Sequence, residues 1–142
     1  MRRVQACPPQ ENESYAKNRK EDAKGRKEDK MKIDWRKEFG GAITVCDCEG
    51  IILEMNEKAI AMFAKDGGAA LIGQNLLDCH PEPTRTKLAA MMREGKTNAF
   101  TLEKNGAKKL IYQTPWFEGG EQKGFMEIDI ELPAEVPNFV RD

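Results

Sequence analysis

The sequence predicts an α+β fold in which helices pack on one face of a five-stranded antiparallel sheet. Three observations carry this prediction. A strand, turn and second strand are indicated between Ala42 and Met55, a helical pattern begins at Thr84, and apolar and charged residues alternate from Phe125 to Leu132. Strands joined by short turns pair in antiparallel fashion. At 142 residues, the chain has room for one hydrophobic core with extensions.

The first elements are expected to be a hairpin and a helix. Ile43 and Val45 alternate with small or polar residues, and the segment 47–50 (DCEG) has the composition of a tight turn. Asn56 follows the return strand, and its side-chain oxygen can accept a hydrogen bond from a free amide in the first turn of a helix. We therefore expect the hairpin to lead directly into a helix that begins after Asn56.

A longer helix and three more strands complete the predicted domain. The helix is expected from Thr84 to Arg93, because prolines precede it and Gly95 can end it. The strands are predicted at Phe100–Glu103, Lys109–Trp116 and Phe125–Leu132, with a polar, glycine-rich loop over residues 117–124 between the last two.

The last strand has two chemically different faces, because its side chains point alternately to either side of the sheet. We interpret the apolar row as facing the core and the acidic row as facing solvent. The strand over residues 110–116 is apolar on both faces, so we expect it to be covered on both sides. The apolar row consists of Met126, Ile128 and Ile130, and the acidic row of Glu127, Asp129 and Glu131.

The two ends of the chain differ from its centre. Residues 1–30 combine mixed charge with few apolar groups, which predicts a disordered or frayed tail. Met31, Trp35 and Phe39 are spaced four apart, which predicts a short flanking helix over residues 31–41. Residues 133–142 are proline-rich and are expected to form a C-terminal tail along the surface.

Charge is distributed unevenly. Residues 1–38 carry 12 Lys and Arg against 8 Asp and Glu, whereas residues 39–142 carry 11 against 16. The predicted domain is therefore acidic, which argues against a nucleic-acid partner, since phosphates need a concentrated positive surface. No apolar run approaches the about 18 residues of a membrane span, and no signal-peptide pattern is present. We expect a cytoplasmic protein with reduced cysteines and no membrane contact.

The pattern Asp47-x-x-Gly50-x-Ile52-x-x-x-Asn56 resembles the opening of a PAS domain, a small α/β sensor module. Two more segments are similar to that family in the right order: residues 71–77 (LIGQNLL) and the last strand, 124–130 (GFMEIDI). The resemblance covers residues 33–132 and implies a PAS-like domain at 42–132. Residues 80–85, 103–106 and 108–116 are further similar to the PAS portion found with hemerythrin-like domains.

The resemblance implies a stand-alone sensory module, which binds a small molecule or a protein and acts in signal transduction. A partner protein would then supply the output. Flanking N-terminal helices of PAS domains often carry a dimer contact, so a homodimer through Met31, Trp35 and Phe39 is expected.

One interpretation of the space between the long helix and the sheet is a pocket for a small apolar ligand, because apolar walls with a few polar groups are typical of small-ligand sites. The same residues at the same spacing can also form a filled core, and both interpretations stay open. The candidate lining residues are Leu88, Met91, Met92, Phe100, Leu102, Tyr112, Thr114, Met126 and Ile128.

Two other functions are alternatives to a sensory module. A haem- or metal-based redox or gas sensor would depend on His80, the only histidine, with Cys79 beside it. Some PAS domains hold haem through a histidine on the long helix, but His80 precedes Pro81, outside that helix, so we expect neither haem nor metal and no required cofactor. No nucleophile with a base stands out, so we expect no enzyme, and a small enzyme of unknown reaction is the other alternative.

Overall fold

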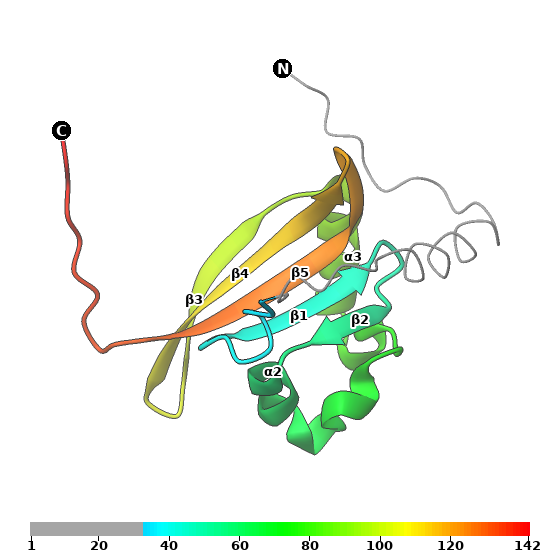
Figure 1. Cartoon of the computed structure of the whole chain (residues 1–142), viewed down its shortest axis with the longest axis horizontal. Helices are drawn as coiled ribbons and strands as arrows, with labels where there is room; N and C mark the ends of the chain where they lie inside the picture. Colours follow the sequence, from blue (N-terminus) through cyan, green and yellow to red (C-terminus); the bar gives the residue numbers. More distant parts are fainter. Residues whose placement is uncertain (1–32) are drawn as a thin grey trace.

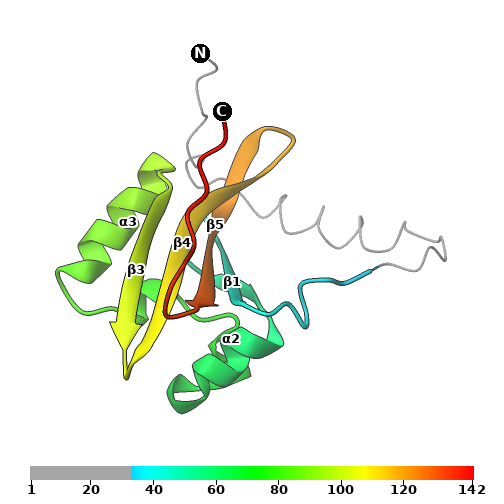
Figure 2. The same cartoon turned by 90° about the vertical axis from the view of Figure 1, so that its left-hand side faces the viewer.

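Five antiparallel strands form one sheet in the order β2-β1-β5-β4-β3, with helical segments packed against one face (Figures 1 and 2). The structure, a computed structural model, describes residues 33–142. The predicted fold class is confirmed. The elements are β1 (Ala42–Asp47), β2 (Ile52–Met55), α2 (Glu57–Met62), the 3-10 helices η1 (Ala64–Asp66), η2 (Gly68–Leu71) and η3 (Leu76–Cys79), α3 (Thr84–Glu94), β3 (Asn98–Lys104), β4 (Ala107–Glu118) and β5 (Glu121–Leu132).

The predicted hairpin between β1 and β2 is confirmed, and Asp47 closes its turn. The Asp47 carboxylate accepts hydrogen bonds from the amides of Glu49 and Ile51, both at 2.9 Å. Gly50 follows with a φ of 89°, a left-handed conformation that glycine adopts without steric cost. Asp47 and Gly50, on which the prediction of the turn is based, therefore stabilise it.

Asn56 begins α2, as predicted. Its Oδ1 accepts from the Ala59 amide at 3.0 Å and from the Ile43 amide at 2.9 Å, while its Nδ2 donates to the Gly41 carbonyl at 2.8 Å. One buried side chain thus caps the helix and joins it to the beginning of β1. The α3 helix also ends as predicted, because Gly95 adopts the left-handed conformation at its C-terminus.

The prediction of a polar loop over residues 117–124 is wrong. These residues form a hairpin, in which Phe117 pairs with Gln122 and Glu118 with Glu121. Gly119 and Gly120, at φ values of 60° and 81°, make the turn alone. Two consecutive residues with positive φ suit a two-residue hairpin turn, so the polar residues on either side continue the strands.

The assignment of faces on β5 is also wrong. Across the β1 and β5 ladder, Thr44 pairs with Glu127 and Ala42 with Asp129, so these four residues share a face of the sheet. Together with residues of the helical layer, they border the spaces beneath that layer. The acidic row therefore faces the helices. The opposite side of the sheet, called the outward apolar face below, carries Ile43, Val45, Leu110, Tyr112, Met126, Ile128 and Ile130.

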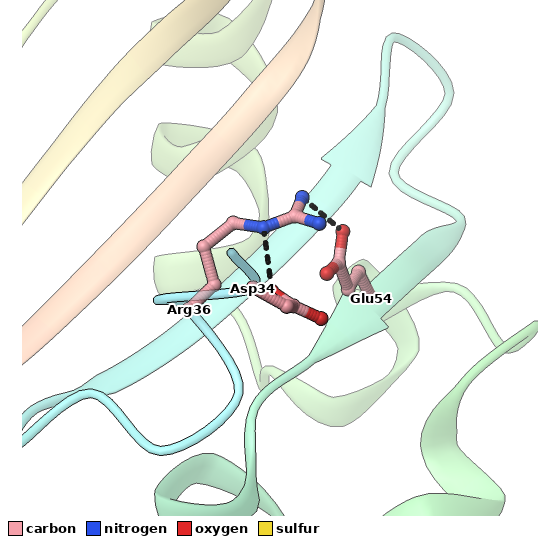
Figure 3. A network of polar contacts seen from close by, with 3 residues as sticks. All are labelled: Asp34, Arg36 and Glu54. Atoms are coloured by element: carbon pink, nitrogen blue, oxygen red, sulfur yellow. Dashed lines mark hydrogen bonds and ion pairs between the residues drawn. The ribbon is translucent and has the colours of Figure 1, made fainter. Parts of the chain in front are cut away.

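No flanking helix forms over the described part of residues 31–41, where residues 35–38 make a turn. Three apolar positions ahead of two glycines do not outweigh the cost of nucleating so short a helix. Arg36 lies between Asp34 at 3.4 Å and Glu54 of β2 at 3.0 Å (Figure 3). Glu54 pairs with Val45, so this segment lies beside the outward apolar face.

Two buried clusters form the core on the helical side of the sheet. One lies around α2 and includes Ala59 and Leu71, and the other lies around α3 and includes Met92 and Phe125.

Residues 133–142 contain no helix or strand, and Phe139 is exposed within them. Within residues 33–142, no helix combines the length and apolar character needed to cross a membrane.

Candidate functional site

A cavity of about 390 Å³ lies between the inward face of the sheet and the helical layer. We call it the central cavity. The sheet contributes residues from β1, β2, β4 and β5, and the helical layer contributes residues from η1 to α3. Its lining residues are Thr44, Cys46, Ile52, Met55, Phe63, Asp66, Leu71, Leu76, Cys79, His80, Leu88, Met92, Gln113, Phe125, Met126 and Glu127.

The helix α3 forms one wall of the central cavity, and Gln122 anchors its C-terminal end. Met92 is buried against Cys46 and Phe125 of the sheet. The Gln122 side chain is buried, and its Nε2 donates to the Met92 carbonyl at 3.1 Å. The same carbonyl also accepts from the Gly95 amide at 3.2 Å, so the Gln122 side chain adds a second donor at the end of α3. Gln122 therefore holds the C-terminal end of α3 against the sheet.

The sheet wall of the central cavity is polar at its centre. Gln113 of β4 and Thr44 of β1 flank Glu127 of β5 on opposite sides. The Nε2 of Gln113 donates to Oε2 of Glu127 at 2.7 Å, a charge-assisted hydrogen bond. Asp66, on η1, adds a second carboxyl group to the lining.

A more open groove of about 510 Å³ lies next to α2 on the same face of the sheet. Lys109 and Asp129 border it and form an ion pair at 3.3 Å, with the Asp129 side chain only 9% exposed. Lys109 also contacts the sulfur of Met62. The groove therefore contains its own neutralising cation.

Two cysteines that line the central cavity, Cys46 and Cys79, differ in burial. Burial raises the pKa of the Cys46 thiol to about 12, so this group stays protonated and inert at neutral pH. Cys79 is an exposed free thiol beside His80. Cys48 is disulfide-bonded, so the expectation that all cysteines are reduced is wrong. Within residues 33–142, no three His, Cys, Asp or Glu side chains are placed to hold a metal ion.

The structure brings part of the predicted pocket together. Leu88 and Met92 line the central cavity, and Met91 packs beside it. Met126 borders the cavity as well, although its position on β5 belongs to the outward row.

The other predicted pocket residues lie elsewhere. Phe100 and Leu102 face inward on the edge strand β3 but do not border the cavity, and they are 42% and 44% exposed. Tyr112, Thr114 and Ile128 lie on the outward side of the sheet, because the faces of β4 and β5 are reversed relative to the prediction.

Most of the polar lining differs from the prediction for the same reason. Gln113 is one of the polar groups that the sequence suggests for the pocket, whereas Glu127 is predicted to face solvent and Thr44 is not predicted to line the pocket. One signal could have found them. The small residues Ala42, Thr44 and Cys46 alternate along β1 and leave room beneath the helices, and their partners on β5 share that face.

The predicted dimer contact lies on the N-terminal segment. Trp35 is 61% exposed, and its ring meets that of Phe39 edge to face with 6.0 Å between centroids. Met31 lies outside the described residues. Trp35 and Phe39 therefore form a local aromatic pair whose tryptophan is available for contact.

Comparison with solved structures finds several PAS domains with the same fold. A sensory box sensor histidine kinase of Vibrio cholerae has a TM-score of 0.51 at 14% identity, over 84% of this chain and 96% of that one. The PAS domain of an HTR-like protein of Haloarcula marismortui gives 0.50 at 16%, over 84% and 99%. The Aer2 receptor of Vibrio cholerae, a dual PAS-heme oxygen sensor, gives 0.54 at 15%, over 66% and 95%. No protein-family model and no curated protein sequence matches the chain.

Proposed function

We propose that this chain, which has the PAS fold, is a sensory module in signal transduction that binds a small molecule in the central cavity. A partner protein would supply the output. The observation that carries the proposal is the cavity itself, because its about 390 Å³ falls within the roughly 300–1,000 Å³ of small-ligand sites. Its apolar walls and few polar groups support the same interpretation. The shared fold with a sensor histidine kinase and with an oxygen sensor supports a sensory role.

The strand β1 offers a short route from the cavity to a partner. Thr44 and Cys46 line the cavity, whereas Ile43 and Val45 of the same strand belong to the outward apolar face. A ligand that moves the inner side chains of β1 also moves the outer ones, because both are attached to one backbone. Ligand binding in the cavity can therefore change the outward apolar face, where a partner protein would bind.

The outward apolar face supports a second copy of this chain as the partner, so that the two copies form a homodimer. Tyr112 lies within it and is 40% exposed. We expect Tyr112→Arg to shift a dimer to a monomer in sedimentation. Leu102→Arg is the matched control, since Leu102 is similarly exposed but on the inward side of the edge strand, and it should leave the dimer intact. A monomeric parent protein would contradict the dimer.

Native mass spectrometry of freshly purified protein tests ligand binding, because it reports the subunit number and any retained molecule together. Leu88→Trp fills the central cavity from α3, and Leu102→Trp adds the same group outside it. We expect the retained mass to be lost in the first variant and kept in the second. If the parent protein retains no molecule and also binds none in a fragment screen by NMR, the proposal is wrong.

A haem sensor is a second candidate, because His80 borders the central cavity. The rest of the lining does not fit haem. Its ionisable groups besides His80 are Asp66, Glu127 and two thiols, with no Lys or Arg to pair with haem propionates. An absorption spectrum of the purified protein decides between the two candidates, since bound haem gives a Soret band that His80→Ala would abolish.

A further inference from the structure

The charge on the wall of the central cavity indicates the chemistry of its ligand. Two of the lining residues, Asp66 and Glu127, carry carboxyl groups, and none of them is Lys or Arg. The remaining lining is mainly apolar, with Met55, Met92 and Phe125 buried. An acidic group on a partly enclosed apolar wall is costly unless a partner compensates its charge.

Glu127 has no cation as a partner among residues 33–142. Its one hydrogen-bond donor there is the neutral amide of Gln113, at 2.7 Å. Lys109 lies on the same face of the sheet but pairs with Asp129 at 3.3 Å, in the neighbouring groove. The inward acidic row is thus neutralised at Asp129 and left unneutralised at Glu127.

We propose that the ligand of the central cavity is a small molecule with an apolar body and a protonated amine, and that the amine pairs with Glu127. This inference rests on the proposed ligand-binding function. The amine places a positive charge beside Glu127, which has no ion-pair partner in the described residues, and its N–H groups donate to the Glu127 carboxylate. The apolar body contacts the side chains of Met92 and Phe125, and methionine adapts to irregular shapes.

Three probes of nearly equal size test the inference: 2-phenylethylamine, the neutral 2-phenylethanol and the anionic 3-phenylpropionate. Each is titrated into ¹⁵N-labelled protein, and the amide shifts of Thr44, Gln113 and Glu127 are followed. We expect the amine to bind about tenfold or more tightly than the alcohol, and the anion to bind most weakly.

Glu127→Gln should remove the preference for the amine and leave the affinity for the alcohol within about twofold. Glu118→Gln is the matched control, because Glu118 is exposed at the end of β4 and does not line the cavity, and it should keep the preference. Unchanged ¹⁵N spectra of the two variants outside the site show that both are folded.

The outcomes separate the two proposals. If the alcohol or the anion shifts the cavity amides as strongly as the amine does, the cavity binds ligands and the inference about charge is wrong. The inference is also wrong if Glu127→Gln keeps the amine preference. If none of the three probes shifts the cavity amides, then ligand binding in the cavity and the inference that rests on it are both contradicted.

Discussion

Asn56 is the polar side chain on which the packing of α2 against the sheet depends most directly. It is only 5% exposed and makes three hydrogen bonds, two as acceptor and one as donor. Asn56→Ala removes all three at once. The substitution exposes the first turn of α2 and leaves the Ile43 amide and the Gly41 carbonyl buried without these partners.

The expected cost follows from these groups. Loss of a helix N-cap costs about 1 kcal/mol, and each buried backbone group left without a partner costs about 1–3 kcal/mol. With the lower end of that range for both groups, we expect Asn56→Ala to lower the free energy of unfolding by about 3 kcal/mol or more. Urea titration followed by tryptophan fluorescence measures this change, and an unchanged slope with denaturant shows that the mutation acts on stability rather than on the unfolded state.

Asn75→Ala provides the matched control. Asn75 caps η3 by accepting from the Leu77 amide at 2.9 Å and donates to the Glu49 carbonyl at 3.0 Å, but it is more exposed than Asn56. Water can replace its bonds, so we expect a loss of about 1 kcal/mol. Equal losses in the two variants would refute the argument that burial of the Asn56 network determines its contribution.

Four further predictions concern two contacts of β5 and the thiols of Cys46 and Cys79. Gly124→Ala should lower the free energy of unfolding by about 3 kcal/mol, because a Cβ there overlaps the Cys46 carbonyl oxygen and the Trp116 indole nitrogen; unchanged urea unfolding would contradict it. Gln122→Glu replaces the donor to the end of α3 by a carboxylate, so this variant should be destabilised and should recover stability as the pH is lowered, which thermal melts at several pH values measure. Iodoacetamide at pH 8 should label Cys79 and spare Cys46 in the folded protein, as detected by mass spectrometry. Since burial raises the Cys46 pKa from 9.0 to about 12, stability should fall as the pH rises from about 9 to about 12.

Much of the fold was predictable because local chemistry determines it. Asp47 and Gly50 indicate a turn, Asn56 indicates a helix start and Gly95 a helix end, and each acts through bonds to residues a few positions away. Their order along the chain then resembles a PAS domain. The turn over residues 35–38 was not predictable in this way, because apolar residues at helical spacing are compatible with either a short helix or a turn.

The candidate site depended on information that a single strand does not contain. Alternation along β5 separates an apolar row from an acidic row, but it does not say which row faces the helices. That choice is made by pairing, since a shift of one residue in register reverses the faces. Here Ala42 and Thr44 of β1 bring Asp129 and Glu127 to the inward side.

The reversed row is what gives the acidic residues a part in the proposed function. A solvent-facing acidic row contributes solubility and little else, whereas an inward one must be compensated. Lys109 compensates Asp129, and its position two residues before Ile111, the β4 partner of Asp129, brings it within reach. Glu127 has only the Gln113 amide. A ligand that carries a positive charge would compensate Glu127 as Lys109 compensates Asp129. The inward carboxylate, which is unusual in a core, thus occurs at the position where ligand binding is proposed.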